Sequence, residues 1–146
     1  MNEEMIMKFP AVLKDKLAKG EIVFPDEIEF EYEKIKVYRA VARAENDYSE
    51  VTRDDFKSYF ELGKKPKNPR GVDKNILKNP HYYGVSSFLK KEIVEQKMGF
   101  PNPKKKMAEG YVYSEGGPQH TQLETQHVCW WLYENTDVSG FKIIEV

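Results

Sequence analysis

The sequence contains a single cysteine among its 146 residues. One cysteine cannot form an intrachain disulfide, which excludes a disulfide-stapled scaffold and favours a reducing compartment such as the cytoplasm. A chain of this length can bury a sufficient hydrophobic core without such crosslinks. We therefore expect one globular cytoplasmic domain spanning residues 1–146, with residues 1–8 as a loosely ordered N-terminal segment.

Long apolar runs and an excess of charge of one sign are also missing. No stretch approaches the roughly 18 apolar residues of a membrane-spanning helix, so no membrane partner is expected. The 23 basic and 24 acidic residues leave no overall field to attract nucleic acid, which argues against a nucleic-acid partner. What the chain has in abundance is rings, with nine Tyr, eight Phe and two Trp, which predict an aromatic core.

Helical signals occur in three places, the first of which begins at Pro10, a residue that suits a first helical turn, and ends at Gly20. Thr52 precedes two aspartates, which suit the positive end of a helix dipole. Ser86 or Ser87 can cap a later helix that Gly99 closes. The sequence thus predicts about three short helices, at residues 10–19, 52–62 and 88–98.

Alternating polar and apolar residues indicate strands elsewhere in the chain. The predicted strands are residues 28–32, 35–41, 111–114, 127–134 and 141–146. A polar segment at 135–140 predicts that the last two form a C-terminal β-hairpin. Helices that alternate with strands early, and strands that group late, predict an α+β fold with a mostly antiparallel sheet.

The segment 119–133 holds two of the three histidines and the only cysteine. On a strand, His127 and Cys129 would share a face, and His120 can approach from the preceding loop, in a ligand set that zinc accepts. However, this spacing matches no closed metal site, and the fourth ligand would have to be the distant His81. We expect no metal site here.

A cysteine nucleophile is the second chemistry that this segment suggests. Such a thiol requires a base and an electropositive, accessible setting. Cys129 instead lies between Val128 and Trp130, in a strand that is apolar on both faces. We therefore interpret Cys129 as a small buried hydrophobic residue.

Three short motifs form the third constellation, and they are spread over the chain. The first is Tyr38–Arg39, on a predicted strand whose odd-numbered face is otherwise apolar. An arginine on such a face must be paired or face a cleft, because burying its charge alone costs several kcal/mol. The second is Ser86–Ser87, where an extended segment enters a helix. The third is Gln122 with Glu124, in a polar segment before a late strand.

This order resembles the ADP-ribosyltransferase-like fold of the Arg-Ser-Glu class, in which an aromatic-Arg pair, a Ser-centred strand end and a Gln/Glu-x-Glu turn surround a bound NAD. The resemblance extends from Tyr38 onward, although the middle motif lacks the usual Ser-Thr-Ser form. It implies NAD as the substrate, with Arg39 contacting the phosphates or supporting the site. It also implies roles for Ser86 or Ser87 in shaping the pocket.

The same resemblance implies the catalytic residues. Glu124 would hold the nicotinamide ribose, and Gln122 would orient the acceptor, which would be a protein or a small molecule. Glu115 is a rival for the acidic role, since it also lies in a polar segment rich in glycine.

The alternative hypothesis is a non-catalytic interaction module. Two basic segments, at residues 64–78 and 104–106, lie before and after the aromatic pair Tyr82–Tyr83. Such loops can bind an acidic protein partner or, less readily for a nearly neutral chain, a nucleic acid.

Overall fold

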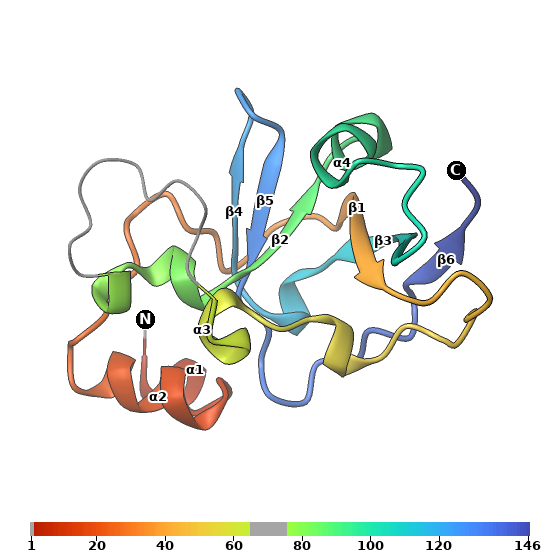
Figure 1. Cartoon of the computed structure of the whole chain (residues 1–146). Coiled ribbons are helices and arrows are strands. Elements are labelled where there is room, and N and C mark those ends of the chain that lie inside the picture. The colour runs from red at the N-terminus through yellow and green to blue at the C-terminus, as the bar shows by residue number, and fades with distance from the viewer. Residues whose placement is uncertain (1, 65–75) are drawn as a thin grey trace.

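Six strands form one antiparallel sheet in the computed structural model, which describes residues 2–64 and 76–146 (Figure 1). The order across the sheet is β4-β5-β2-β1-β3-β6. The strands are β1 (Ile35–Ala42), β2 (Val85–Phe88), β3 (Lys105–Val112), β4 (Gln119–Gln122), β5 (His127–Trp130) and β6 (Lys142–Ile144). The predicted α+β class with a mostly antiparallel sheet is confirmed.

Four short α-helices accompany the sheet in the described part of the chain: α1 (Glu3–Met7), α2 (Ala11–Ala18), α3 (Tyr59–Leu62) and α4 (Lys91–Met98). The helix predicted at 10–19 is confirmed as α2, whereas the segment 1–8, expected to be loosely ordered, contains α1. Gly99 ends α4 in the left-handed conformation, as predicted. No helix among these residues is long and apolar enough to cross a membrane.

The single helix predicted at 52–62 is wrong. Residues 53–55 form a 3-10 turn, and α3 begins only after Ser58. Phe56 leaves the helical conformation and is completely buried. Ser58 caps α3, because its hydroxyl accepts the Glu61 amide at 3.2 Å while its own amide donates to the Glu61 carboxylate at 3.1 Å. Burial of one aromatic ring has therefore divided the helix.

Ser86 and Ser87 are not helix caps, contrary to the prediction. Both lie inside β2, where Ser86 pairs with Cys129 and Ser87 with Val128 of β5. The apolar residues at the two ends of β2, Val85 and Phe88, are buried and favour the strand. As a consequence α4 begins at Lys91, three residues later than predicted.

The strands differ from the prediction at both ends of the chain. The segment predicted at 28–32 forms one isolated bridge, between Glu29 and Gln119. The strand at 35–41 is confirmed as β1. The predicted C-terminal hairpin is wrong, because β5 pairs with β2 and β4 whereas β6 pairs only with β3. The hairpin that does form joins β4 to β5, and its turn stands at the top of the picture (Figure 1).

The two sides of the sheet bury different clusters. One side, here called the Trp130 face, carries Val37, Val41, Val85 and Trp130, which pack with Phe56 and other apolar side chains. The opposite side is covered in part by α4, whose Val94 packs on Phe88 and Met107. We call this second side the histidine face. The largest fully buried side chains among the described residues are aromatic, namely Trp130, Trp131, Phe9 and Phe56, but most of the buried hydrophobic residues are aliphatic, so the predicted aromatic core is only partly confirmed.

Gly110 of β3 packs against the ring of Phe141 with no room for a side chain. A Cβ atom at Gly110 would lie 2.5 Å from the ring of Phe141. We predict that Gly110→Ala lowers the free energy of unfolding by about 1–3 kcal/mol, because the ring cannot retreat within a packed core. Urea denaturation measures this loss. Gly140→Ala is the control, since no atom lies within 4 Å of its Cβ position, and an equal loss in both variants would contradict the prediction.

Candidate functional site

Arg39 is held inside the protein by main-chain carbonyls. Its guanidinium donates to the carbonyl of Ser86 in β2, and to that of Asp55 at 2.9 Å. The group also lies 4.9 Å from the centre of the Phe56 ring. Burial lowers the pKa of Arg39 to about 10, against the attraction of the Asp55 carboxylate, so the side chain stays charged at neutral pH. Arg39 thus links the first and second motifs directly.

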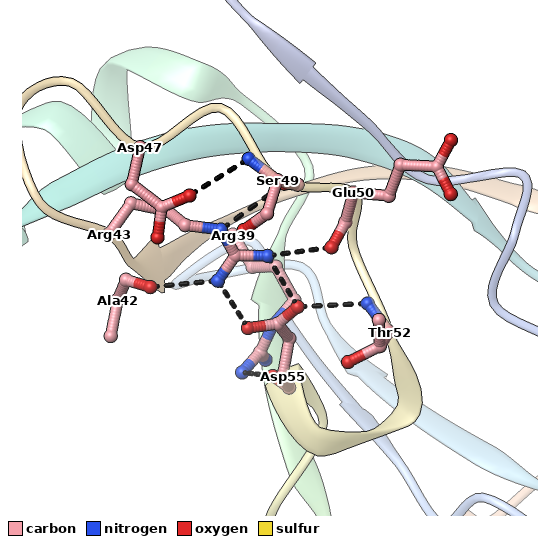
Figure 2. A network of polar contacts seen from close by, with 8 residues as sticks. All are labelled: Arg39, Ala42, Arg43, Asp47, Ser49, Glu50, Thr52 and Asp55. Carbon is pink, nitrogen blue, oxygen red and sulfur yellow. Dashed lines mark hydrogen bonds and ion pairs between the residues drawn. The ribbon is translucent and has the colours of Figure 1, made fainter.

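Arg43 directly follows the last residue of β1, and it forms an ion pair with Asp55, whereas Arg39 forms none within the described residues (Figure 2). Its two terminal nitrogens contact the two carboxylate oxygens of Asp55 at 2.7 and 2.8 Å. The same guanidinium donates to the carbonyls of Ala42, Ser49 and Glu50. Burial alone would raise the pKa of Asp55, but the hydrogen bonds from Arg43 and Thr52 lower it. Arg43 thereby ties residues 49–55 to β1.

The register of the sheet separates the predicted site residues onto two faces. Tyr38, Phe88, His127 and Gln122 occupy one row across β1, β2, β5 and β4. Because neighbouring residues of a strand point to opposite faces, Arg39 and the buried Ser87 lie on the Trp130 face.

By the same alternation, three of the predicted residues share the histidine face: Tyr38, Ser86 and Gln122. Ser87, by contrast, lies beneath the surface on the other face. Its hydroxyl and Nε of Arg39 are buried without a hydrogen-bond partner among the described residues. Native proteins keep few such unpaired groups, each of which costs about 1–3 kcal/mol.

Ser86 contacts a histidine that the sequence motifs did not include. Its hydroxyl oxygen lies 2.8 Å from Nε2 of His127 in β5. The ring of His127 packs edge-on against Phe88, with 5.3 Å between the ring centres. Burial, together with the nearby His81 and His120, lowers the pKa of His127 to about 4. His127 is therefore neutral at physiological pH and can accept or donate one hydrogen bond at each ring nitrogen.

The other two histidines of the chain form a pair beside this contact. Nε2 of His81 lies 3.0 Å from Nδ1 of His120. The ring of His81 also contacts Trp131, with 5.3 Å between ring centres. Burial lowers the pKa of His81, and the neighbouring His120 adds to this effect. All three histidines thus gather on one face, although they are far apart in the sequence.

This arrangement fits ligand positioning better than nucleophilic catalysis. A serine nucleophile requires a base that a third group orients. Ser86 and His127 are within hydrogen-bond distance, but no carboxylate of the described residues hydrogen-bonds His127. A base with a pKa near 4 is also too weak to remove a serine proton efficiently at neutral pH. The pair instead offers a hydroxyl and an imidazole to a polar ligand.

Glu124 and Gln122 lie at the edge of this face. Gln122 ends β4 directly opposite His127. Glu124 is exposed in the turn that joins β4 to β5, next to Leu123, whose side chain is 78% exposed. The rival carboxylate, Glu115, lies in a separate 3-10 turn at residues 114–116. The turn of Glu124, and not that of Glu115, therefore adjoins the row that contains Tyr38 and His127.

Cys129 is buried between Ser86 and His120 in the sheet, as the sequence predicted. Burial raises the pKa of its thiol, which makes it inert. Within residues 2–64 and 76–146, no group of three or more His, Cys, Asp or Glu side chains has an arrangement suited to a metal ion.

The basic segments of the alternative hypothesis are only partly described, because residues 65–75 lie outside the described residues. In the second segment, Lys106 is used within the fold. Its Nζ donates to the carbonyls of Ala44 and Glu45 and lies 4.4 Å from the Tyr48 ring centre. Lys105 and Lys106 are strand residues of β3 and not loop residues. Lys104 and the partly described first segment remain as the basis of that hypothesis.

Two cavities lie elsewhere in the described part of the chain. The larger, of about 1110 Å³, follows the β3–β6 edge and the segment 100–102. The smaller, of about 160 Å³, lies between α2, α3 and β2. Neither is lined by Ser86, His127 or Glu124.

Comparisons with protein-family models, with curated proteins and with solved structures found no match for this chain. The site is accordingly defined by its own geometry. In the sequence, His81, His120 and His127 are linked only as part of the rejected metal site, and the three motifs include none of them. Alternation in the sequence could place His127 and Cys129 on one face, but only the register between β2, β4 and β5 brings Ser86 and His120 to them.

The Arg43–Asp55 pair gives a stability prediction. Its side chains are only 8% and 11% exposed. We predict that Arg43→Met lowers the free energy of unfolding by about 3–5 kcal/mol, because it leaves the Asp55 carboxylate enclosed and unpaired. Lys36→Met is the matched control, since the Lys36 and Glu109 side chains are 48% and 33% exposed and a pair this open to solvent should contribute less than about 1 kcal/mol. Equal losses in urea denaturation would contradict this.

The low pKa of His127 gives a pH prediction. The unfolded chain binds this proton near pH 6.5, whereas the folded protein binds it only near pH 4. The unfolded state therefore holds more protons between these values, and the stability contributed by neutral His127 is lost as the pH falls through that window. We expect His127→Gln to flatten the decrease in melting temperature between pH 6.5 and 4.5. Parallel curves for both proteins would show the prediction to be wrong.

Proposed function

We propose that this protein binds NAD against the histidine face and either transfers ADP-ribose or cleaves the nicotinamide–ribose bond, as its resemblance to the Arg-Ser-Glu class implies. One observation carries the proposal: a chain of contacts connects all three motifs. Arg39 holds the main chain of Ser86, the Ser86 hydroxyl contacts His127, and His127 pairs with Gln122 at the base of the turn that carries Glu124.

The proposed roles follow from these positions. Arg39 supports the site from the opposite face, because its donors are directed to the carbonyls of Ser86 and Asp55. Ser86 and His127 offer hydrogen bonds to ribose hydroxyls, and Tyr38 lies in the same row as His127. Ser87 is buried and contributes to packing rather than to contact with the dinucleotide.

Glu124 supplies the carboxylate of the proposed reaction. The nicotinamide–ribose bond breaks through an oxocarbenium-like state, and a carboxylate nearby stabilises the positive charge that develops on the sugar. Gln122, two residues earlier, orients the acceptor. The exposed Leu123 between them gives a protein acceptor an apolar contact. A reducing compartment such as the cytoplasm suits a chain whose one cysteine is buried and unpaired.

The test follows both products of the reaction. Purified protein is incubated with NAD and cell extract, and free nicotinamide and labelled ADP-ribose on protein are measured. We predict that Glu124→Gln lowers turnover about 100-fold or more, the usual effect of removing one charge-stabilising group. Glu115→Gln is the matched control, because it makes the same change in a turn away from the histidine face.

Two results would count against the proposal. If the wild-type protein releases no nicotinamide, labels no target and shows no change in melting temperature with NAD, the protein is not an NAD enzyme. If turnover is lost in Glu115→Gln and kept in Glu124→Gln, the site has been assigned to the wrong turn.

A further inference from the structure

The smaller cavity is about as large as a protein cavity that is known to bind an aromatic molecule. Its volume is about 160 Å³, and it lies between α2, α3 and β2. An engineered protein cavity of about 150 Å³ with apolar walls binds benzene. The space therefore suits an apolar group of about six heavy atoms. Its walls are mostly apolar: Val12, Leu13, Phe60, Tyr83, Val85 and Leu132.

One cation, Arg53, lies in the wall of this cavity. Its Nη1 donates to the carbonyl of Phe56 at 2.7 Å, while its Nε is buried without a partner. Burial lowers the pKa of Arg53, yet an arginine keeps its charge at neutral pH. In contrast to Arg43, which is paired with Asp55, Arg53 forms no ion pair with any described carboxylate. A half-buried cation beside an apolar space favours an anion.

Two acidic residues offset part of this charge from a distance. Glu61 also lines the cavity, but one of its carboxylate oxygens accepts both the amide and the hydroxyl of Ser58. Asp54 lies 4.0 Å from the ammonium of Lys57. Both acids raise the pKa of Arg53 through their charge, and this opposes the larger effect of burial. The guanidinium thus retains free donors for a ligand, and Glu61 weakens anion binding at the same site.

We propose that this cavity binds a small monocarboxylate that carries one compact apolar group, with the apolar group inside and the carboxylate on Arg53. Pockets for small molecules combine apolar walls with a few polar groups that fix orientation, and the arginine fork matches a carboxylate in shape and charge. The site is separate from the histidine face, since none of its lining residues belongs to the row that contains Tyr38 and His127. It therefore does not depend on NAD chemistry.

Three small molecules, added to the full chain without any substitution, test whether binding requires both the carboxylate and the apolar group of the ligand. Benzoate has both features, benzyl alcohol lacks the charge, and acetate lacks the ring. By titration followed with amide NMR, benzoate should bind saturably and shift the signals of Leu13 and Val85. Benzyl alcohol and acetate should each bind at least tenfold more weakly. Equal affinity of benzoate and benzyl alcohol, or no saturable binding of benzoate, overturns the proposal.

Matched variants then test Arg53. Arg53→Met should weaken benzoate at least tenfold, whereas Lys57→Met, which removes the same charge outside the cavity, should leave the affinity within twofold. Glu61→Gln should strengthen benzoate binding severalfold, because it removes a repulsive carboxylate. If Arg53→Met does not fold, Glu61→Gln decides the matter, and an unchanged or weaker affinity in that variant contradicts the proposal.

Discussion

A buried guanidinium must find hydrogen-bond acceptors, and the way that Arg39 finds them organises this protein. Its donors reach a carbonyl of β2 and the carbonyl of Asp55, and its plane lies near the Phe56 ring. Arg43 adds a bidentate pair with Asp55 and three more carbonyls. Arg39 in β1 and Arg43 just after it thereby fix the segment 49–56 against the Trp130 face.

The hydrogen bond from Arg39 to the carbonyl of Ser86 also affects the histidine face. Because the carbonyl of Ser86 is held by Arg39, and because β2 alternates, the Ser86 hydroxyl is presented to His127 on the other side of the sheet. A contact in the interior therefore determines the position of a surface group. In the NAD site that we propose, Arg39 would accordingly support the main chain of Ser86 from the opposite face, and Ser86 would contact the ligand.

Short-range signals in the sequence predicted some of these features and missed others. Periodicity identified β1 and α2, and the isolated charge on the odd-numbered face of β1 indicated that Arg39 needs partners. Ser86 and Ser87 were misread, because a serine pair before a charged helix has the same local pattern whether it caps the helix or precedes it in a strand. The break at Phe56 was also missed, since it depends on burial against Trp130 and Phe141. Likewise, the histidine cluster depends on strand register, which no local pattern encodes.

The order of the strands in the sheet also affects when they can pair during synthesis and folding. β2 lies at the centre of the sheet, between β1 and β5, yet its second neighbour is not synthesised until residues 127–130. During synthesis, the middle strand must wait for a partner from late in the chain, and pairing across such separations is slow. A ribosome-bound chain that ends before β5 would display β2 with one side unpaired. The histidine face therefore cannot be completed before β5 has been made, because His127 itself and its contacts with Ser86 and Gln122 require that strand.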